Sequence, residues 1–197
     1  EINERPPTLA LPAYPRDRAY SGDPKTNWRC KECHGWDYRG RDGAYSTGPH
    51  ATGIKGIHGM AGGDAQTIVA ILKDATHAYD GLMADEDFRD LANFVSKGQV
   101  DMGRYVDRAT KMAKGHNSRR QDHYKSICTG CHGRDGHRLR TIPPLGDVAR
   151  SNPWESLHKI LNGHPAEKMP ALRVLDRETL ADILAYVQTL PDGEVVS

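Results

Sequence analysis

The chain has 197 residues, of which 37% are hydrophobic and only two are Phe, while Gly and Pro number 20 and 12. This is a thin supply of apolar side chains for two small domains, and small loop-rich domains of this kind usually need a disulfide, a metal or a large cofactor for stability. The 27 basic and 26 acidic residues nearly balance, which excludes the strongly basic surface of a nucleic-acid-binding protein, and no run approaches the ~20 apolar residues of a transmembrane segment.

The first half is predicted to contain a short helix, a glycine-rich loop and two amphipathic helices. Pro24 lies six residues before Cys30, so only a short helix can precede this cysteine. The glycine-rich loop is TGPHATGIKGIHGMAGG, and Asp64 after it is a suitable N-cap for the helix AQTIVAILKD. The last helix of this half begins at Asp85 and is stopped by Gly98. Its apolar stripe consists of Phe88, Leu91, Ala92 and Val95.

The chain is expected to divide into two helical domains. We expect a first domain at residues 1–100, a connector at 101–117 and a second domain at 118–197. The second domain is predicted to begin with a helix from about Ser118 that runs into the sequence CTGCH. A loop with the sequence PPLG, at residues 143–146, follows it.

Two more helices are predicted in the second half. Asn152 is a suitable N-cap for the first of them, Pro153 suits its first position, and Glu155 completes a capping-box pattern. Asp176 caps the last helix and Pro191 ends it. The two apolar stripes consist of Trp154, Leu157, Ile160 and Leu161 in the first helix and Leu180, Ile183, Leu184 and Val187 in the second.

All four cysteines lie in two C-x-x-C pairs, CKECH and CTGCH, and a histidine directly follows each pair. C-x-x-C-H is the attachment signature of c-type haem. Its two thiols reach the two vinyl groups on one edge of the porphyrin, and the next residue places an imidazole nitrogen over the iron. We therefore expect two covalently bound haem c groups. The attachment cysteines are then Cys30, Cys33, Cys128 and Cys131, and the histidines that bind iron are His34 and His132.

Three other uses of the cysteines explain the pattern less well. A four-cysteine zinc site would bring the two pairs together and would not require a histidine after each. Thioredoxin-like redox pairs would need a βαβ context, which the pattern lacks. Two disulfides would leave the repeated histidines unexplained.

The haem groups also indicate where the protein works. Covalent haem attachment of this kind takes place outside the cytoplasm in bacteria. The chain starts EINERPPTLALPAYP, without an initiator Met, so we expect a mature periplasmic form that remains after removal of a signal peptide.

Residues 118–190 resemble the small all-helical class I cytochromes c. The motifs that carry this resemblance are C-x-x-C-H, a proline loop, and KMP before a C-terminal amphipathic helix. The resemblance implies that His132 is the proximal iron ligand and Met169 the distal one, and that the carbonyl of Pro143 accepts a hydrogen bond from the proximal imidazole. His164 is the rival of Met169. The helix before CTGCH is then expected to turn Tyr124 and Ile127 toward the haem.

The whole chain resembles a tandem di-haem c-type cytochrome, like the haem subunits of flavocytochrome sulfide dehydrogenases and free periplasmic di-haem shuttles. The resemblance implies an all-α fold of two class I cytochrome c domains in tandem, each wrapped around one covalently bound haem. We refer to the haem of CKECH as haem 1 and to that of CTGCH as haem 2.

The distal ligand of haem 1 is less certain from the sequence, and the candidates are His50, His58, Met60, His77 and Met83. The last helices of the two halves can be aligned with an offset of 92 residues, which pairs Phe88 with Leu180 and Val95 with Val187. The same offset places His77 at the position of Met169. His77 is therefore favoured, and Met83 is the main alternative.

These ligand sets predict an electron carrier rather than an enzyme, because two protein ligands on each iron leave no open position for a substrate. A His/His haem 1 would have a lower potential than a His/Met haem 2, since the axial ligand is a main determinant of haem potential. Electrons would then flow from haem 1 to haem 2. The expected partners are redox proteins, such as a dehydrogenase or a terminal oxidase or reductase, met through small transient interfaces.

Two other functions remain open. One is a sulfur-compound oxidoreductase similar to di-haem thiosulfate dehydrogenases. Those enzymes use a cysteine as an axial ligand, whereas haem attachment consumes all four cysteines here. The other is a haem subunit of a larger dehydrogenase, which would co-purify with a flavin or molybdenum subunit.

Overall fold

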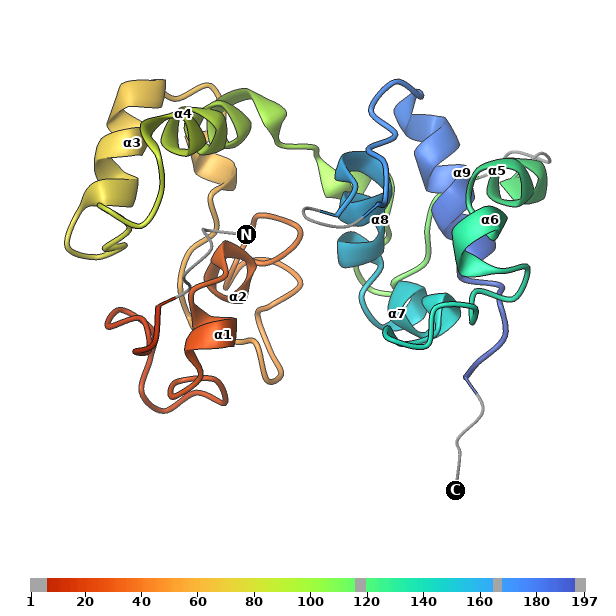
Figure 1. Cartoon of the computed structure of the whole chain (residues 1–197), viewed down its shortest axis with the longest axis horizontal. Coiled ribbons are helices and arrows are strands. Elements are labelled where there is room, and N and C mark those ends of the chain that lie inside the picture. Colours follow the sequence, from red (N-terminus) through yellow and green to blue (C-terminus); the bar gives the residue numbers. More distant parts are fainter. Residues whose placement is uncertain (1–6, 116–119, 165–167, 194–197) are drawn as a thin grey trace. The chain divides into compact units, whose positions relative to one another are not determined.

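The computed structural model describes residues 7–115, 120–164 and 168–193, and it confirms the all-α fold class over these residues. Helices are the regular elements of this part of the chain, which otherwise contains two isolated β-bridges and no strand (Figure 1). None of the described helices is long and apolar enough to cross a membrane. The contacts divide the chain into two compact units, Glu1–Val100 and Asp101–Ser197.

The first unit has the helices expected from its sequence, and carboxylates fix their starts. The Asp23 carboxylate accepts the Lys25 N–H at 2.9 Å, and the Asp64 carboxylate accepts the Thr67 N–H at 2.7 Å. The last helix begins at Asp85 as expected, Ala84 is its N-cap, and the Asp87 carboxylate accepts the Ala84 N–H. The elements are α1 (Pro24–Asn27), α2 (Cys30–His34), η1 (His58–Met60), α3 (Ala65–Lys73), α4 (Asp85–Asn93) and the π turn η2 (Phe94–Gly98).

An aromatic-rich cluster forms the core of the first unit around the Cys33 thiol. The Trp28 and Tyr79 rings meet edge to face with their centroids 5.4 Å apart, and the Tyr79 hydroxyl donates to the Trp28 carbonyl at 2.5 Å. Met83 is partly buried and packs against this cluster. The buried members are Leu11, Tyr14, Trp28, Cys33, Tyr79 and Phe88.

The second unit packs its helices around α9. The Asp176 carboxylate accepts the Thr179 N–H at 2.7 Å at the start of α9, and the four residues of its predicted stripe are all buried. The Asn152 side chain caps α8 through the Glu155 N–H, with Pro153 at the first position as predicted. Helices α5, α7 and α8 all contact α9. The elements are η3 (Met102–Arg104), α5 (Arg120–Ile127), α6 (Thr129–His132), α7 (Leu145–Ser151), α8 (Pro153–Asn162) and α9 (Arg177–Val187). Ser118, the predicted start of α5, lies outside the described residues.

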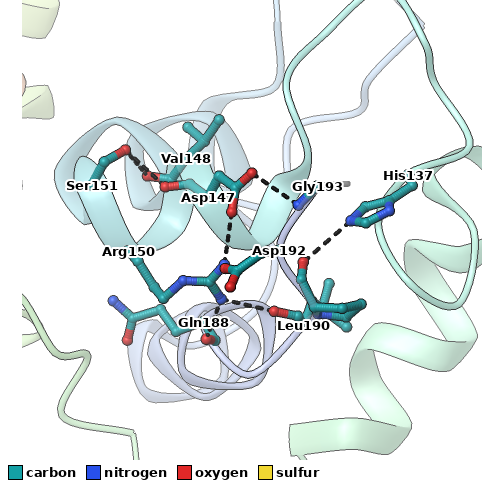
Figure 2. Close-up of polar contacts among 10 residues, drawn as sticks. His137, Asp147, Val148, Arg150, Ser151, Gln188, Leu190, Asp192 and Gly193 are labelled. Carbon is teal, nitrogen blue, oxygen red and sulfur yellow. Dashed lines mark hydrogen bonds and ion pairs between the residues drawn. The ribbon is translucent and has the colours of Figure 1, made fainter. Parts of the chain in front are cut away.

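The prediction that residues 143–146 form a loop was wrong for its second half, because α7 starts at Leu145. A tertiary network supports this short helix (Figure 2). The Arg150 guanidinium donates to the carbonyls of Gln188 and Leu190 at 2.9 and 2.7 Å, and it pairs with the carboxylates of Asp147 and Asp192. Because these partners follow α9 or lie within α7 itself, the network ties the segment after α9 to α7.

The expected connector at 101–117 also differs from the structure over its described part. Residues 101–115 belong to the second unit, and Met102 and Val106 are almost fully buried. The Gln188 side chain accepts the Ala113 N–H at 2.9 Å and donates to the Lys111 carbonyl at 2.7 Å. This stretch is therefore packed against α9 rather than free.

Candidate haem-binding sites

The two C-x-x-C-H motifs fold in the same way. Each forms a short helix, α2 or α6, and ends at a glycine with positive φ, Gly35 at 73° or Gly133 at 80°. The carbonyl of each motif histidine then accepts a backbone N–H from the following loop, at 2.8 Å for His34 and 3.0 Å for His132. The halves therefore present their cysteines and histidines on equivalent backbone.

The structural repeat extends three residues beyond each motif. The Asp37 carboxylate accepts the Arg39 N–H at 3.2 Å, and the Asp135 carboxylate accepts the His137 N–H at 3.0 Å. Both halves thus contain C-x-x-C-H-G-x-D, with the aspartate closing the turn that follows the histidine. The identical spacing of these aspartates is visible in the sequence, as CKECHGWD and CTGCHGRD.

None of the four cysteines, all of which lie within the described residues, forms a disulfide. Burial is the main cause that raises the pKa of Cys33 to about 12 and that of Cys128 to about 11. No three His, Cys, Asp or Glu side chains within the described ranges are placed to hold a metal ion together. Neither the disulfide nor the zinc interpretation gains support from this arrangement.

His34 is oriented by the glycine-rich loop. Its Nδ1 lies 2.8 Å from the Lys55 carbonyl oxygen, and burial lowers its pKa, so the ring is neutral at pH 7 and donates the Nδ1 proton. The Nε2 lone pair is then the one left for a metal, as in most metal-binding histidines. This carbonyl partner was not predictable from residue types, because every residue carries a carbonyl.

Close backbone contacts hold Lys55 in place. Gly40 and Lys55 form an antiparallel bridge, and the Arg41 N–H donates to the Ile54 carbonyl at 2.8 Å. A Cβ on Gly40 would lie 2.4 Å from the Ile54 carbonyl oxygen, and a Cβ on Gly56 would lie 2.0 Å from a carbonyl oxygen of the opposite segment. These two glycines are therefore required for the close approach that brings the Lys55 carbonyl to His34.

Gly40→Ala is expected to destabilise the first unit by about 2 kcal/mol more than Gly53→Ala. Both glycines have positive φ, at 53° and 74°, and both substitutions carry the left-handed conformational cost of about 1–2 kcal/mol. Only the methyl group at position 40 would meet backbone, since nothing lies within 4 Å of a Cβ at Gly53. Denaturant unfolding of the two variants measures the difference, and equal midpoints would contradict the role given to this contact.

His77 lies beside His34. The centroids of the two rings are 6.3 Å apart and their planes differ by 24°. The Nδ1 of His77 is 3.3 Å from a carboxylate oxygen of Asp74, which leaves its Nε2 for a metal as well. Ala78, the next residue, has a left-handed φ of 54°, and its N–H closes the turn by donating to the Asp74 carbonyl at 2.7 Å. A constrained turn at this point is typical of a functional loop.

The spacing of these two rings fits one metal ion between them. If each Nε2 bound a metal at about 2 Å, with the nitrogen roughly 1 Å in front of its ring centre, the centres would be about 6 Å apart. The observed distance between the ring centres is 6.3 Å, in a pair of rings stacked at 24°. The residues of the first unit therefore fit a haem iron held by His34 and His77.

The other candidates for the distal position of haem 1 have different surroundings. The ring of His50 lies 5.3 Å from that of Tyr20 and 4.7 Å from that of Tyr45, and its Nδ1 is 2.7 Å from the buried Glu32 carboxylate. His58 and Met60 lie together in η1, and Met83 packs against the aromatic core. Of the five candidates, His77 is the one that the structure places beside His34.

In the second unit, the predicted hydrogen bond between His132 and the Pro143 carbonyl is not formed. The Nδ1 of His132 is buried and has no hydrogen-bond partner among the described residues, while Pro143 is exposed in the turn before α7. Burial lowers the pKa of His132, so its ring is also neutral at pH 7. Its Nε2 or Nδ1 lone pair is thus available to a metal.

Apolar side chains on the surface of the second unit flank the CTGCH motif. Ile127, Leu139 and Ile142 are each about two-fifths exposed. Ile127 directly precedes the motif and was expected to face the haem, and a haem attached to Cys128 and Cys131 would provide an apolar surface for such a side chain. Tyr124, which was expected to face the haem, is fully buried and donates to the Gly133 carbonyl at 2.8 Å.

Met169 lies in a loop that is fastened to the end of α8. Its carbonyl accepts the His164 N–H at 3.4 Å, and the Leu172 N–H donates to the Ile160 carbonyl at 3.3 Å. Gly163 has a φ of 71°, and a Cβ there would lie 2.6 Å from the Met169 carbonyl oxygen. The backbone next to Met169 is thus well defined, and the Met169 side chain is half-buried.

Comparison with known proteins agrees with the geometry of the second unit. Residues 116–187 match the family described as "Cytochrome C oxidase, cbb3-type, subunit III", which is less than half of the chain. No curated protein and no solved structure matches the chain. The chain therefore contains a c-type cytochrome domain at residues 116–187, a domain of the kind that binds haem c covalently and transfers electrons.

Proposed function

We propose that this protein is a periplasmic di-haem c-type cytochrome that carries single electrons between redox proteins. In this proposal each unit is a class I cytochrome c domain wrapped around one haem. Cys30 and Cys33 attach haem 1, and Cys128 and Cys131 attach haem 2. The bound haem irons would supply the chemistry, a reversible change between the ferrous and ferric states.

The observation that carries the proposal is the arrangement of His34 and His77. The two Nδ1 atoms contact the Lys55 carbonyl and the Asp74 carboxylate, which leaves two Nε2 atoms on rings 6.3 Å apart. This supports a second haem site in the half of the chain that the family match does not reach. The shared C-x-x-C-H-G-x-D backbone supports the same conclusion.

The protein ligands determine how the two sites differ. His34 and His77 would hold the iron of haem 1, while His132 and Met169 would hold the iron of haem 2. A thioether ligand favours the reduced iron more than an imidazole does, so the His/His site has the lower reduction potential. Occupied axial positions leave no place for a substrate, which favours an electron carrier over an enzyme.

Charge distinguishes the two units and bears on their partners. Residues 1–100 contain 12 basic and 14 acidic residues, whereas residues 101–197 contain 15 basic and 12 acidic residues. The second unit is therefore the more basic one and is suited to a partner with an acidic surface. A dehydrogenase on one side and a terminal oxidase or reductase on the other would fit a carrier with two unequal sites.

A spectroelectrochemical titration of the intact protein tests the proposal. We expect two haems per chain by haem assay, two separated one-electron waves, and a long-wavelength absorption band of methionine-ligated ferric haem in the higher-potential component alone. A single haem would contradict the di-haem assignment. Turnover with thiosulfate or sulfite and an artificial electron acceptor would favour the oxidoreductase, and co-purification with a flavin or molybdenum subunit would favour the dehydrogenase subunit.

A further inference from the structure

We propose that Asp74 is a positioning residue that makes His77 a stronger electron donor and thereby lowers the reduction potential of haem 1. This inference rests on the proposed function, in which His77 is an iron ligand. The inference assigns a role to Asp74, which neither attaches the haem nor binds its iron.

The backbone places the Asp74 carboxylate against the His77 ring. Asp74 is the C-cap of α3, and one of its carboxylate oxygens accepts the backbone N–H groups of Thr76 and His77, both at 2.9 Å. The same oxygen lies 3.3 Å from the His77 Nδ1. The turn therefore fixes the carboxylate and the imidazole relative to each other, independently of the side-chain contact between them.

The two histidines of the haem 1 site have partners of different charge. His34 donates to a neutral carbonyl, whereas His77 faces a carboxylate. A carboxylate that accepts the Nδ1 proton raises the basicity of the ring. A more basic imidazole stabilises ferric iron relative to ferrous iron, so the potential falls.

Lys73, the residue before Asp74, forms its ion pairs with two other carboxylates. The Lys73 ammonium lies 2.9 Å from the Asp85 carboxylate and 3.8 Å from that of Asp80. The charge of Asp74 is therefore available to His77. Its side chain is 44% exposed, so water screens part of the effect and a moderate change is expected.

The test compares Asp74→Asn with Asp74→Ala and Asp80→Asn in the intact holoprotein. Asparagine retains a side-chain oxygen that can accept the backbone N–H groups of Thr76 and His77, but it carries no charge. We expect Asp74→Asn to shift the redox equilibrium between the two haems about tenfold toward reduced haem 1, which is about 59 mV for one electron. The g-values of the ferric low-spin signal of haem 1 should change in the same samples, while the potential of haem 2 stays constant.

Asp80→Asn is the matched control, because it removes an exposed charge from the same loop at a residue that pairs with Lys73. If Asp74→Asn shifts haem 1 no more than Asp80→Asn does, the inference is overturned. It is also overturned if Asp74→Ala shifts the potential and Asp74→Asn does not, since Asp74 would then only shape the turn. A His77→Ala variant whose haem 1 stays low-spin would reject the ligand assignment and with it this inference, whereas the di-haem carrier itself would be rejected by a haem assay that gives one haem per chain.

Discussion

His77→Ala is expected to convert haem 1 from a low-spin to a high-spin site that binds carbon monoxide when reduced. The physical reason is that the substitution removes the only side chain that the structure places opposite His34 among the five candidates, 6.3 Å away between ring centres. Haem 2 should remain low-spin, because its proposed ligands, His132 and Met169, belong to the other unit. Absorption spectra of the reduced protein with carbon monoxide, together with ferric electron paramagnetic resonance, measure both haems in one sample.

Met83→Ala is the appropriate control for this experiment. Met83 lies six residues after His77 and packs against the aromatic core of the first unit. Its truncation should cost about 2 kcal/mol or more of stability and leave haem 1 closed to carbon monoxide. The opposite pattern, in which Met83→Ala opens the haem and His77→Ala does not, would show that the ligand is Met83.

Met169→His is expected to lower the potential of haem 2 by on the order of 0.1 V, within the roughly 0.8 V that axial ligands span. The two redox waves should then approach each other, because both haems would have two imidazole ligands. The long-wavelength band of methionine ligation should disappear at the same time. Spectroelectrochemistry of the variant beside the wild-type protein measures both effects.

Two further variants make this second result specific. Met112 is 52% exposed in the same unit, so Met112→His should leave the two waves separate. His164 donates its backbone N–H to the carbonyl of Met169 and is the rival ligand. If His164→Ala loses the low-spin spectrum of haem 2 and Met169→Ala keeps it, the distal ligand is His164 and not Met169.

The alignment of the two halves of the sequence shows how far the distal ligand of haem 1 can be predicted. The motifs repeat at an offset of 98 residues and the last helices at 92. The motif offset would place Ile71 of α3 at the position of Met169, whereas the helix offset gives His77, which the structure places beside His34. The segment between the motif and the last helix differs in length between the halves. The offset of the last helices is therefore more accurate for a residue close to these helices than the offset of the motifs.

Other features depend on contacts that residue types do not reveal. The Lys55 carbonyl that orients His34 comes from backbone geometry, and any residue could have supplied it. Helix α7 has only seven residues, and its Arg150 finds its partners after α9, about 40 positions along the chain. Capped helices with clear apolar stripes, such as α8 and α9, were predictable because their local signals agree with their packing.

The packing of residues 101–115 against α9 determines where the two halves can be separated. The side chain of Gln188 holds this stretch through Ala113 and Lys111, and it also donates to the Ala149 carbonyl at 3.0 Å. A fragment that began after residue 117 would lose the bonds to Ala113 and Lys111 and leave the Gln188 side-chain oxygen without the N–H that it accepts. For isolating each haem in its own polypeptide, the natural point of division is therefore between Val100 and Asp101.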